Sequence, residues 1–433
     1  MTSSCILALD LGTTAFKAAP VDETGVRGRV TVTPYELDYL DYAEGRVTCN
    51  PERYVSCAWK ALRGAARTAR EQGLTVRAVG LSSQAQTYVA LDERGQPVQP
   101  AVVWTDTQAV PEAEEAARAL PDFARTCGFV RPNPMQFLPK VMRFRREGGQ
   151  ARWFVLLNEW VTYRLTGELY GDSTNQGMGG FYDITKQAWN ERALALAGIT
   201  ADNLAAVAPA AARGACLTRL VCGALDLPAV PVYSCGNDQS CAAVGAGIEE
   251  EGDLFCNFGT ALVVYALKSR PMEPSSEDQI AGISPLPGRW FLLGLESECG
   301  NVVEWLARLL YPRKGVDTMI EAALKAEEVP TALPQFALHG GGRLDIHDLS
   351  LGCRREELAR ALLEYYAAQF GALLAGVTAA GKPPRRLFAG GGLSRSAHWL
   401  ELLGKRHHLT LQPTAGEHPG LVGVAKIIAN RRG

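Results

Sequence analysis

The chain has 433 residues, of which 47% are apolar and 21% are charged, and its formal net charge at pH 7 is −2. These proportions are typical of a globular protein and exclude a disordered or fibrous one. Because there is no basic excess, we expect neither nucleic acid nor a membrane as a partner. The length exceeds what one compact core usually holds and predicts two domains.

The segment Met1–Ala8 lacks the charged and long apolar stretches of a signal peptide, and no apolar run is long enough to cross a bilayer. The 11 cysteines are scattered without a CxxC pair. That pattern is typical of reduced thiols rather than of a disulfide framework. We therefore expect a cytoplasmic location.

The chain opens with a predicted β-hairpin whose tip contains Gly12, Thr13 and Thr14. Gly12 lets a ligand approach the main chain, and the turn N–H groups and threonine hydroxyls can bind phosphate. Asp10 ends the first strand and repels phosphate unless a cation lies between them. Mg²⁺ is usually held by one or two carboxylates together with substrate phosphates. A plain turn capped by Asp10 is the alternative interpretation.

The next elements alternate strands with helices. Asn50 and Pro51 predict the start of a helix that ends at Gly73. Strands are predicted at Val30–Leu37, Val76–Leu81, Tyr88–Leu91 and Ala101–Trp104. Arg131–Pro139 contains three prolines and predicts an irregular loop, either a connector or part of a substrate pocket. A second helix is predicted to carry Trp153, Phe154, Leu157, Trp160, Val161 and Leu165 and to end at Gly167.

Asp238 follows the predicted strand Val230–Tyr233 and precedes small residues that favour a closely packed helix. An aspartate at a strand-to-helix junction is often only an N-cap. A carboxylate there can also take the proton of an alcohol that attacks a phosphorus atom. The residues alone leave both interpretations open.

Near residue 250 the opening pattern repeats. Asp253–Asn257 predicts a strand, Gly259 and Thr260 form its turn, and Ala261–Leu267 predicts the return strand. Asn257 stands where the first hairpin has its aspartate, which fits one nucleotide–metal complex held from two sides. We place the domain boundary between residues 247 and 248.

A glycine run follows the predicted strand Leu387–Ala389 and precedes a predicted helix, Ala397–Gly404. Glycines there let a flat ligand lie against the main chain, and a helix N-terminus favours anionic groups. The run lacks the spacing of a Rossmann fingerprint. Further helices are predicted at Asn301–Leu310 and Arg355–Val377.

Six segments, in this order, resemble the FGGY family of carbohydrate kinases, within the actin-like and hexokinase ATPase superfamily. They are Ala8–Thr14, Val103–Asp106, Tyr163–Gly167, Gly236–Gln239, Asn257–Thr260 and Ala389–Gly392. The resemblance implies an α/β fold of two ribonuclease-H-like lobes with an active-site cleft between them. Residues 1–247 would bind the sugar and carry the catalytic base, and residues 248–433 would bind ATP.

The resemblance also assigns roles to single residues. Asp10 would organise Mg²⁺ through water, and Asp238 would be the catalytic base. The ATP-binding residues would be Gly12, Thr13, Thr14, Lys17, Gly259, Thr260, Gly390, Gly391, Gly392 and Ser394.

Gln84, Ala85 and Gln86 align with the family's sugar-contacting turn, which xylulokinases fill with a Met-His pair and glycerol kinases with an Arg-Glu pair. Ala85 leaves room, and Gln86 offers a neutral donor and acceptor that suit hydroxyls rather than a carboxylate. Asp106 can accept hydrogen bonds from two hydroxyls, and Gln239 completes the predicted sugar site. Gln108 stands where many relatives have arginine, so a standard pentulose or glycerol specificity does not follow.

We therefore expect ATP- and Mg²⁺-dependent phosphorylation of a hydroxyl on a ketose or polyol. Two alternatives remain: a pseudokinase that senses sugar or nucleotide, and an actin- or chaperone-like ATPase that needs no sugar. A homodimer is the default expectation for assembly.

Overall fold

The computed structural model describes residues 3–41, 45–325, 334–339 and 343–430. The chain divides into two compact units, each of mixed α/β structure. Unit 1 contains Met1–Glu249, Lys268–Phe291 and His418–Gly433, and unit 2 contains Glu250–Leu267 and Leu292–Glu417. Two segments beyond residue 247 thus belong to unit 1.

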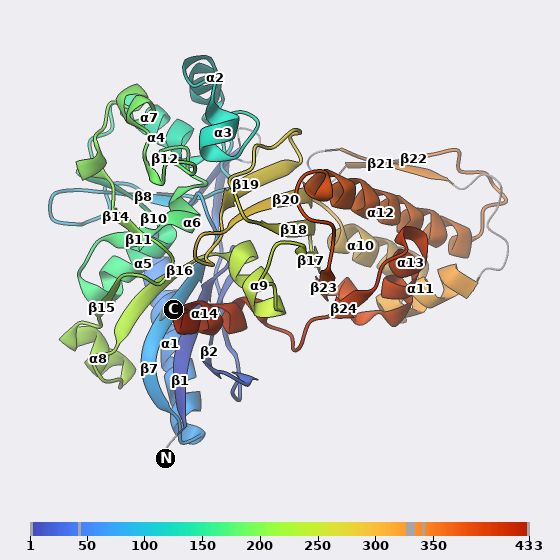
Figure 1. Ribbon diagram of the computed structural model, residues 1–433, viewed down its shortest axis with the longest axis horizontal. Coiled ribbons are helices and arrows are strands. Elements are labelled where there is room, and N and C mark those ends of the chain that lie inside the picture. The colour runs from blue at the N-terminus through green and yellow to red at the C-terminus, as the bar shows by residue number, and fades with distance from the viewer. Residues whose placement is uncertain (1–2, 42–44, 326–333, 340–342, 431–433) are drawn as a thin grey trace. The chain divides into compact units, whose positions relative to one another are not determined.

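The main sheet of unit 1 has the strand order β15-β16-β7-β1-β2-β3, with β4 paired to β2. Its strands are β1 (Ser4–Leu11), β2 (Ala15–Asp22), β3 (Gly25–Val26), β4 (Thr31–Pro34), β7 (Thr75–Ser83), β15 (Gly214–Cys216) and β16 (Pro231–Asn237). β1 and β2 form the predicted antiparallel hairpin. β1, β7 and β16 run parallel to one another and lie side by side (Figure 1), so their carboxyl ends meet at one edge of the sheet.

A second sheet of unit 1 has the order β10-β8-β9-β6-β5. Its strands are β5 (Asp38–Asp41), β6 (Arg46–Cys49), β8 (Tyr88–Leu91), β9 (Ala101–Val102) and β10 (Trp153–Leu156). The shorter strands pair as β11 (Tyr170–Asp172) with β14 (Ala206–Ala208) and β12 (Tyr182–Asp183) with β13 (Ala188–Trp189). β19 (Gln279–Ile283) also belongs to unit 1.

Two helices of unit 1, α9 (Asp238–Ala246) and α14 (Pro419–Asn430), pack closely against each other. A Cβ on Gly245 would lie 1.7 Å from Pro419 O, and one on Gly423 would lie 1.8 Å from Cys241 O. Only glycine therefore permits this close approach. The other helices are α1 (Pro51–Glu71), α2 (Val110–Ala119), α3 (Phe123–Cys127), α4 (Phe137–Arg146), α5 (Leu157–Thr166), α6 (Ser173–Gln176), α7 (Glu191–Leu196), η1 (Ala201–Asn203) and α8 (Arg219–Leu225).

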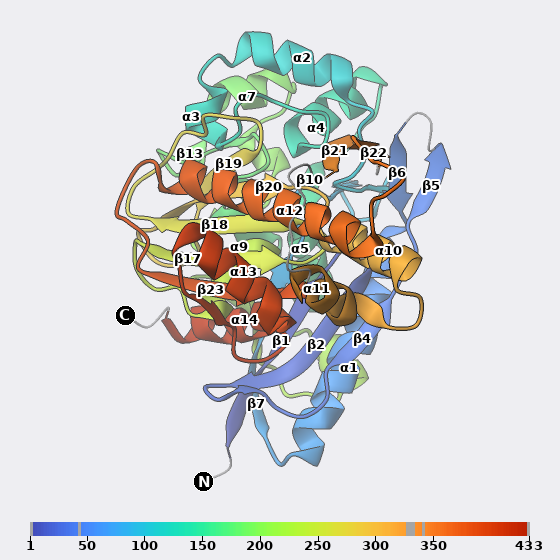
Figure 2. The same cartoon turned by 90° about the vertical axis from the view of Figure 1, so that its right-hand side faces the viewer.

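Unit 2 is built on parallel and antiparallel pairs around β17 (Asp253–Phe258). β17 pairs antiparallel with β18 (Leu262–Lys268) and parallel with β23 (Arg386–Gly390), which pairs with β24 (Leu411–Pro413). α12 (Arg355–Thr378) packs against α11 (Gly315–Lys325) and α13 (Ala397–His407) (Figure 2). The remaining elements are β20 (Trp290–Glu296), which crosses the unit boundary, α10 (Gly300–Leu310), β21 (Gln335–His339), β22 (Arg343–His347) and η2 (Leu393–Arg395).

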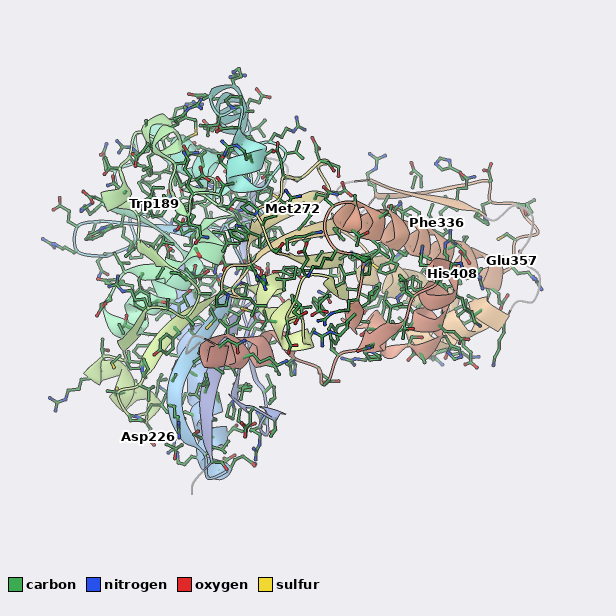
Figure 3. All side chains as sticks on the ribbon, viewed as in Figure 1. Trp189, Asp226, Met272, Phe336, Glu357 and His408 are labelled. Carbon is green, nitrogen blue, oxygen red and sulfur yellow. The ribbon has the colours of Figure 1, made fainter. Side chains whose placement is uncertain are left out.

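The core of unit 1 joins α1 and α5 to the main sheet, and Trp160 and Tyr54 are among its fully buried side chains (side chains are drawn in Figure 3). The 11 cysteines are free thiols and most are buried. Within the described ranges, no helix combines the length and the apolar composition needed to cross a bilayer.

Three predictions of secondary structure were wrong. Trp153–Leu156 is the strand β10 rather than the start of a helix, because it pairs in register with β8. The third strand of the opening meander ends at Pro34, where the chain leaves β2. The predicted loop ends before Pro139, which sits in the first turn of α4, where a helix needs no N–H donor. In addition, several helices had no counterpart among the predicted elements, namely α2, α3, α4, α6, α7, α8, α11 and α14.

Candidate active site

The parallel strands of unit 1 place Asp10 and Asp238 at the same edge of the main sheet. In the strand register Asp10 lies beside Ser82, and Ser82 lies beside Gly236. Asp238 follows two residues later, as the first residue of α9. Ligands of open α/β sheets bind at the carboxyl ends of the parallel strands, which is where both aspartates lie.

The N-cap of α9 is Asn237, not Asp238. The Asn237 side chain accepts a hydrogen bond from Ser240 N at 2.9 Å, as a cap does. Asp238 accepts one from Gln239 N at 2.8 Å and is half-buried. The helix therefore does not need the Asp238 carboxylate as its cap.

Both carboxylates are held where ionisation is unfavourable. Burial, together with the charge of Asp10, raises the pKa of Asp238 to about 7. Burial also raises the pKa of Asp10, and the opposing charge of Lys17, its partner across the hairpin, offsets part of that effect. A group with a pKa near 7 can both accept and release a proton at neutral pH.

The surroundings of Asp10 fit a hydrated cation. Its Oδ1 is buried and has no hydrogen-bond partner among the described residues. No group of three or more His, Cys, Asp or Glu side chains there has the arrangement of a metal site. A single carboxylate with a free acceptor suits Mg²⁺ that keeps its waters and phosphate ligands, and it does not suit an all-protein cage.

The tip of the first hairpin is fixed by side chains from segments that follow other strands. Trp104 Nε1 donates to Thr13 Oγ1 at 2.9 Å, and Tyr35 OH donates to Gly12 O at 2.6 Å. Gln84 Nε2 lies 3.2 Å from Tyr35 OH. Thr14 is exposed beside them. Nothing in the sequence pattern had marked Trp104 or Tyr35 as supports of this turn.

The predicted sugar-contacting turn is largely buried and partly committed to the main chain. Gln86 has a φ of 70°, its Oε1 accepts from Phe137 N at 3.0 Å, and its Nε2 donates to Met178 O. One N–H and one lone pair of this amide remain for a ligand. Gln239 Oε1, in contrast, is buried and has no partner among the described residues. Ala85 adds no polar group.

Asp106 is buried, and each of its carboxylate oxygens accepts a main-chain hydrogen bond. Oδ2 accepts from Val47 N at 2.8 Å and Oδ1 from Gln108 N at 3.2 Å. These bonds fix its orientation and leave lone pairs for a ligand's hydroxyls.

In unit 2, the second hairpin and the glycine run meet at the ends of two parallel strands, where Asn257 pairs with Gly390. Gly391 has a φ of 86°, and a Cβ on it would lie 2.4 Å from Phe258 C. Gly259 O accepts from Gly300 N at 2.9 Å, and Thr260 O accepts from Cys299 N at 2.6 Å. The predicted residues of this unit thus form one main-chain cluster.

The glycine run precedes a helix, α13, which starts at Ala397 as predicted. The short η2 intervenes, and Ser394 within it donates to Gly391 O at 2.8 Å. α13 starts after it and is capped by Ser396, which accepts from Trp399 N. Gly392 has open space where a Cβ would stand.

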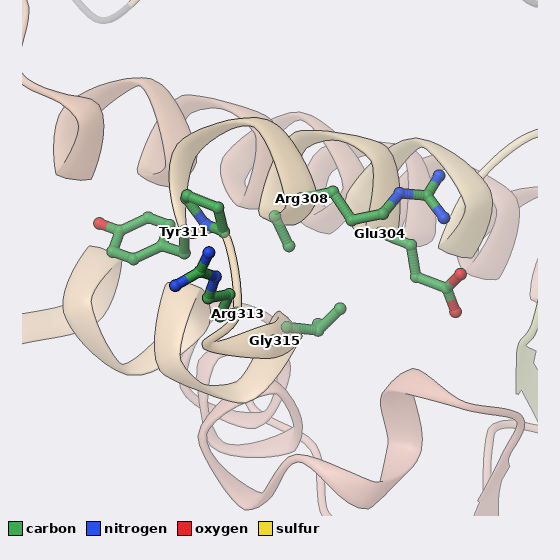
Figure 4. A pocket seen from close by; sticks show the side chains of 8 residues that line it. Glu304, Arg308, Tyr311, Arg313 and Gly315 are labelled. Carbon is green, nitrogen blue, oxygen red and sulfur yellow. The ribbon is translucent and has the colours of Figure 1, made fainter.

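Two surface depressions lie elsewhere. One, of about 380 Å³, lies beside α10 and α11 and is lined by Glu304, Ala307, Arg308, Tyr311, Pro312, Arg313, Gly315 and Val316 (Figure 4). The other, of about 590 Å³, is in unit 1 beside Asn50 and Arg164. No predicted site residue lines either one, so neither bears on the chemistry considered above.

Comparison with known proteins identifies the family. The N-terminal domain of the FGGY family of carbohydrate kinases matches residues 5–245, and its C-terminal domain matches residues 254–430. The chain is 24% identical to xylulose kinase of Escherichia coli K12, over 98% of this chain and 90% of that protein. It is 26% identical to glycerol kinase of Thermococcus gammatolerans, over 84% of this chain and 76% of that protein.

The fold agrees with a solved structure, that of ligand-bound xylulose kinase from Lactobacillus acidophilus. The TM-score is 0.89 at 18% identity, with coverage of 99% of this chain and 89% of that one. This likeness confirms the predicted fold class. Since the two family domains together match most of its length, the chain belongs to the FGGY family of carbohydrate kinases.

Proposed function

We propose that the chain transfers the γ-phosphoryl group of ATP to a hydroxyl of a neutral ketose or polyol, with Asp238 as the general base. The observation that carries the proposal is the state of Asp238. Because Asn237 caps α9, the Asp238 carboxylate is not used as the helix cap. It is partly buried, and its pKa is about 7. The alcohol's proton needs an acceptor in this range.

The two substrates and the residues of this chain account for every bond and proton in the reaction. A substrate hydroxyl attacks the γ-phosphorus, its proton passes to an Asp238 oxygen, and the bond from phosphorus to the β,γ-bridging oxygen breaks to release ADP. Mg²⁺, when bound near Asp10, supplies neutralisation of phosphate charge. Asp10 would hold the ion through water, and Lys17, Gly12, Thr13 and Thr14 would bind phosphate oxygens.

The residues of unit 2 bind the remainder of ATP. Main-chain groups at Gly259 and Thr260 hold phosphate, and Gly390, Gly391 and Gly392 lie against the adenosine, with Ser394 supporting Gly391 through its carbonyl. Positioning and electrostatic stabilisation account for most of the rate in phosphoryl transfer.

The sugar is bound by neutral and acidic side chains of unit 1. Gln84, Gln86 and Gln239 offer amide groups, Asp106 offers carboxylate lone pairs, and Ala85 leaves room. Amides and carboxylates suit hydroxyls, whereas a carboxylate on the substrate would face the negative charge of Asp106. The similarity to proteins named xylulose kinase and glycerol kinase supports a substrate with several hydroxyls.

The test is coupled ADP release with ATP and Mg²⁺ over a panel of ketoses, polyols, aldoses and sugar acids. We expect a sugar-dependent signal and, in Asp238→Ala, a kcat lower by on the order of 10²–10⁴. Asp226→Asn, at an exposed aspartate that ends α8 (Figure 3), is the control for loss of an acidic side chain and should leave kcat unchanged.

Two outcomes contradict the proposal. Near-normal kcat in Asp238→Ala would remove the base assignment. Sugar binding without ADP formation by the wild-type chain would favour a sensing pseudokinase.

A further inference from the structure

Lys140 is a buried lysine that the reaction derived above does not use. It lies on the inner face of α4, and only 3% of its surface is exposed. Its ammonium donates to Val103 O at 2.6 Å, and among the described residues it makes no ion pair. Burying an ammonium without a carboxylate in contact is unfavourable, so a structural or functional gain must offset it.

The compensation for burying the ammonium is its hydrogen bond to a turn of the main chain at Val103. Val103 O accepts twice, from Lys140 Nζ and from Asp106 N at 3.0 Å. The ammonium therefore closes the turn from Val103 to Asp106 at its first residue. The same turn carries Trp104, whose indole N–H donates to Thr13.

The charge of Lys140 favours the same orientation of Asp106 as its hydrogen bond to the turn does. Burial lowers the pKa of Lys140 to about 7, while attraction to the Asp106 carboxylate opposes that effect. Asp106 already accepts from Val47 N and Gln108 N, so its carboxylate has one orientation. A cation behind the turn stabilises the negative charge in that orientation.

The start of α4 is tied to the second predicted sugar contact. Phe137 N, at the first residue of the helix, donates to Gln86 Oε1 at 3.0 Å. Phe137 and Lys140 stand three residues apart, which is neighbouring positions on a helix surface. One helical turn thus holds both Gln86 and the turn that carries Asp106.

We propose that Lys140 is a positioning residue for sugar binding, which acts by fixing the Val103–Asp106 turn and thereby the Asp106 carboxylate. This inference rests on the proposed function, since Asp106 binds the sugar only if the chain is a sugar kinase of the kind described. Lys140 itself touches neither the substrate nor the reacting atoms in this account.

The experiment compares KM for the sugar with KM for ATP. Lys140→Met keeps an unbranched side chain, one heavy atom shorter, and removes the ammonium. We expect KM for the sugar to rise about tenfold or more, as for the loss of a hydrogen bond from a charged group, while KM for ATP stays within about twofold. Lys140→Arg, which keeps a cation and donors, should recover most of the sugar affinity.

Two matched controls lie on the same helix. Arg145→Met removes an exposed positive charge and should change neither constant. Met142→Ala removes buried apolar volume, so it should lower the unfolding temperature without raising KM for the sugar. A rise in KM in Met142→Ala equal to that in Lys140→Met would reduce Lys140 to a purely structural role.

A double-mutant cycle tests the route of the effect. If Lys140 acts through Asp106, then Lys140→Met added to Asp106→Asn should raise KM for the sugar by no more than about twofold beyond Asp106→Asn alone. Full multiplication of the two effects, or an unchanged KM in Lys140→Met, would overturn the proposal. Should Lys140→Met fail to fold, Lys140→Gln against Lys140→Arg gives the same comparison.

Sugar binding measured by calorimetry without ATP separates this inference from the proposed function. A wild-type chain that binds sugar but forms no ADP refutes the proposed reaction, and the loss of affinity in Lys140→Met still tests Lys140. A wild-type chain that binds no sugar of the panel overturns both.

Discussion

The two Gly-Thr hairpins follow the same path but are held in different ways. The tip of β1–β2 is fixed by side chains, because Trp104 donates to Thr13 and Tyr35 donates to the carbonyl of Gly12. The tip of β17–β18 is fixed by main chain, through Gly300 N and Cys299 N. The first turn therefore depends on side chains for its position, and the second depends on main-chain groups.

They also differ in charge. The first hairpin carries Asp10 and the second carries Asn257 at the corresponding place. One carboxylate is enough to hold a hydrated cation that also contacts phosphates, and a second one would repel those phosphates. The two hairpins thus share a strand–turn–strand arrangement, and of the two only the first carries a carboxylate at this place.

The largest expected effect comes from making the first hairpin resemble the second. Asp10→Asn should lower kcat by about 10²–10³, the loss typical of removing one group that stabilises transition-state charge. The rate measured against Mg²⁺ concentration should also need more metal to saturate. If Asp10→Asn kept the wild-type rate and the wild-type Mg²⁺ dependence, the distinction between the hairpins would have no functional meaning.

A smaller effect should follow from disturbing the main-chain cluster of the second hairpin. Gly391→Ala places a Cβ 2.4 Å from Phe258 C on a residue with φ of 86°, so we expect a loss of about 1–3 kcal/mol in the free energy of unfolding. KM for ATP should rise with it. Gly392→Ala, where space is open and φ is −60°, is the control for stability and should unfold at the wild-type temperature.

A pH-dependent effect on stability is expected at Asp238, which lies at the same sheet edge as Asp10. The pKa of Asp238 is about 7 in the folded chain, against an ordinary value of 3.8. Its stabilising contribution is therefore present below about pH 4 and is lost as the pH rises through about 7. Asp238→Asn should therefore unfold at a higher temperature than the wild type at pH 8 and at nearly the same temperature at pH 4.

Two features make this pH comparison specific. Lys140 and Glu159 also have shifted pKa values, but both are present in wild type and variant and cancel in the difference. In an Asp10→Asn background the pKa of Asp238 falls, so the gain at pH 8 should shrink. A gain that is equal at both pH values would contradict the assignment of the shift to Asp238.

Local signals in the sequence were enough for the elements that frame the site. The apolar run before Asp10 and the glycine after it predict the first hairpin, and Asn50 with Pro51 predicts the start of α1, whose cap the structure contains. These signals depend on residues within one turn or one strand. For that reason the elements that they predict agree with those in the structure.

Features that depend on residues far away in the sequence were predicted wrongly or were not predicted. Trp153–Leu156 has an aromatic and apolar pattern that fits helix and strand alike, and its pairing with β8 decides the outcome. Whether Asp238 caps α9 could not be decided from the sequence either, because the neighbouring Asn237 takes the capping position only in the folded chain.

The burial of Lys140 was not predicted, although its position in the sequence pattern of α4 indicates it. It stands among Phe137, Val141 and Phe144 on the face of α4 that is otherwise apolar, while the exposed face carries Arg145 and Arg146. A lysine on the apolar side of an amphipathic helix is rare enough to predict a buried contact. Its partner, the carbonyl of Val103, has no side-chain signature and could be found only in three dimensions.

The close approach of α14 to α9 has a consequence for biosynthesis. The segment that closes over the helix beginning with Asp238 is translated after the whole of unit 2, and it also packs on β7, where a Cβ on Gly80 would lie 2.3 Å from Val424 Cγ1. On the ribosome, the earlier unit in sequence is therefore the later one to be completed. A nascent chain that has not yet released residues 419–430 therefore carries Asp238 on a helix that α14 does not yet cover.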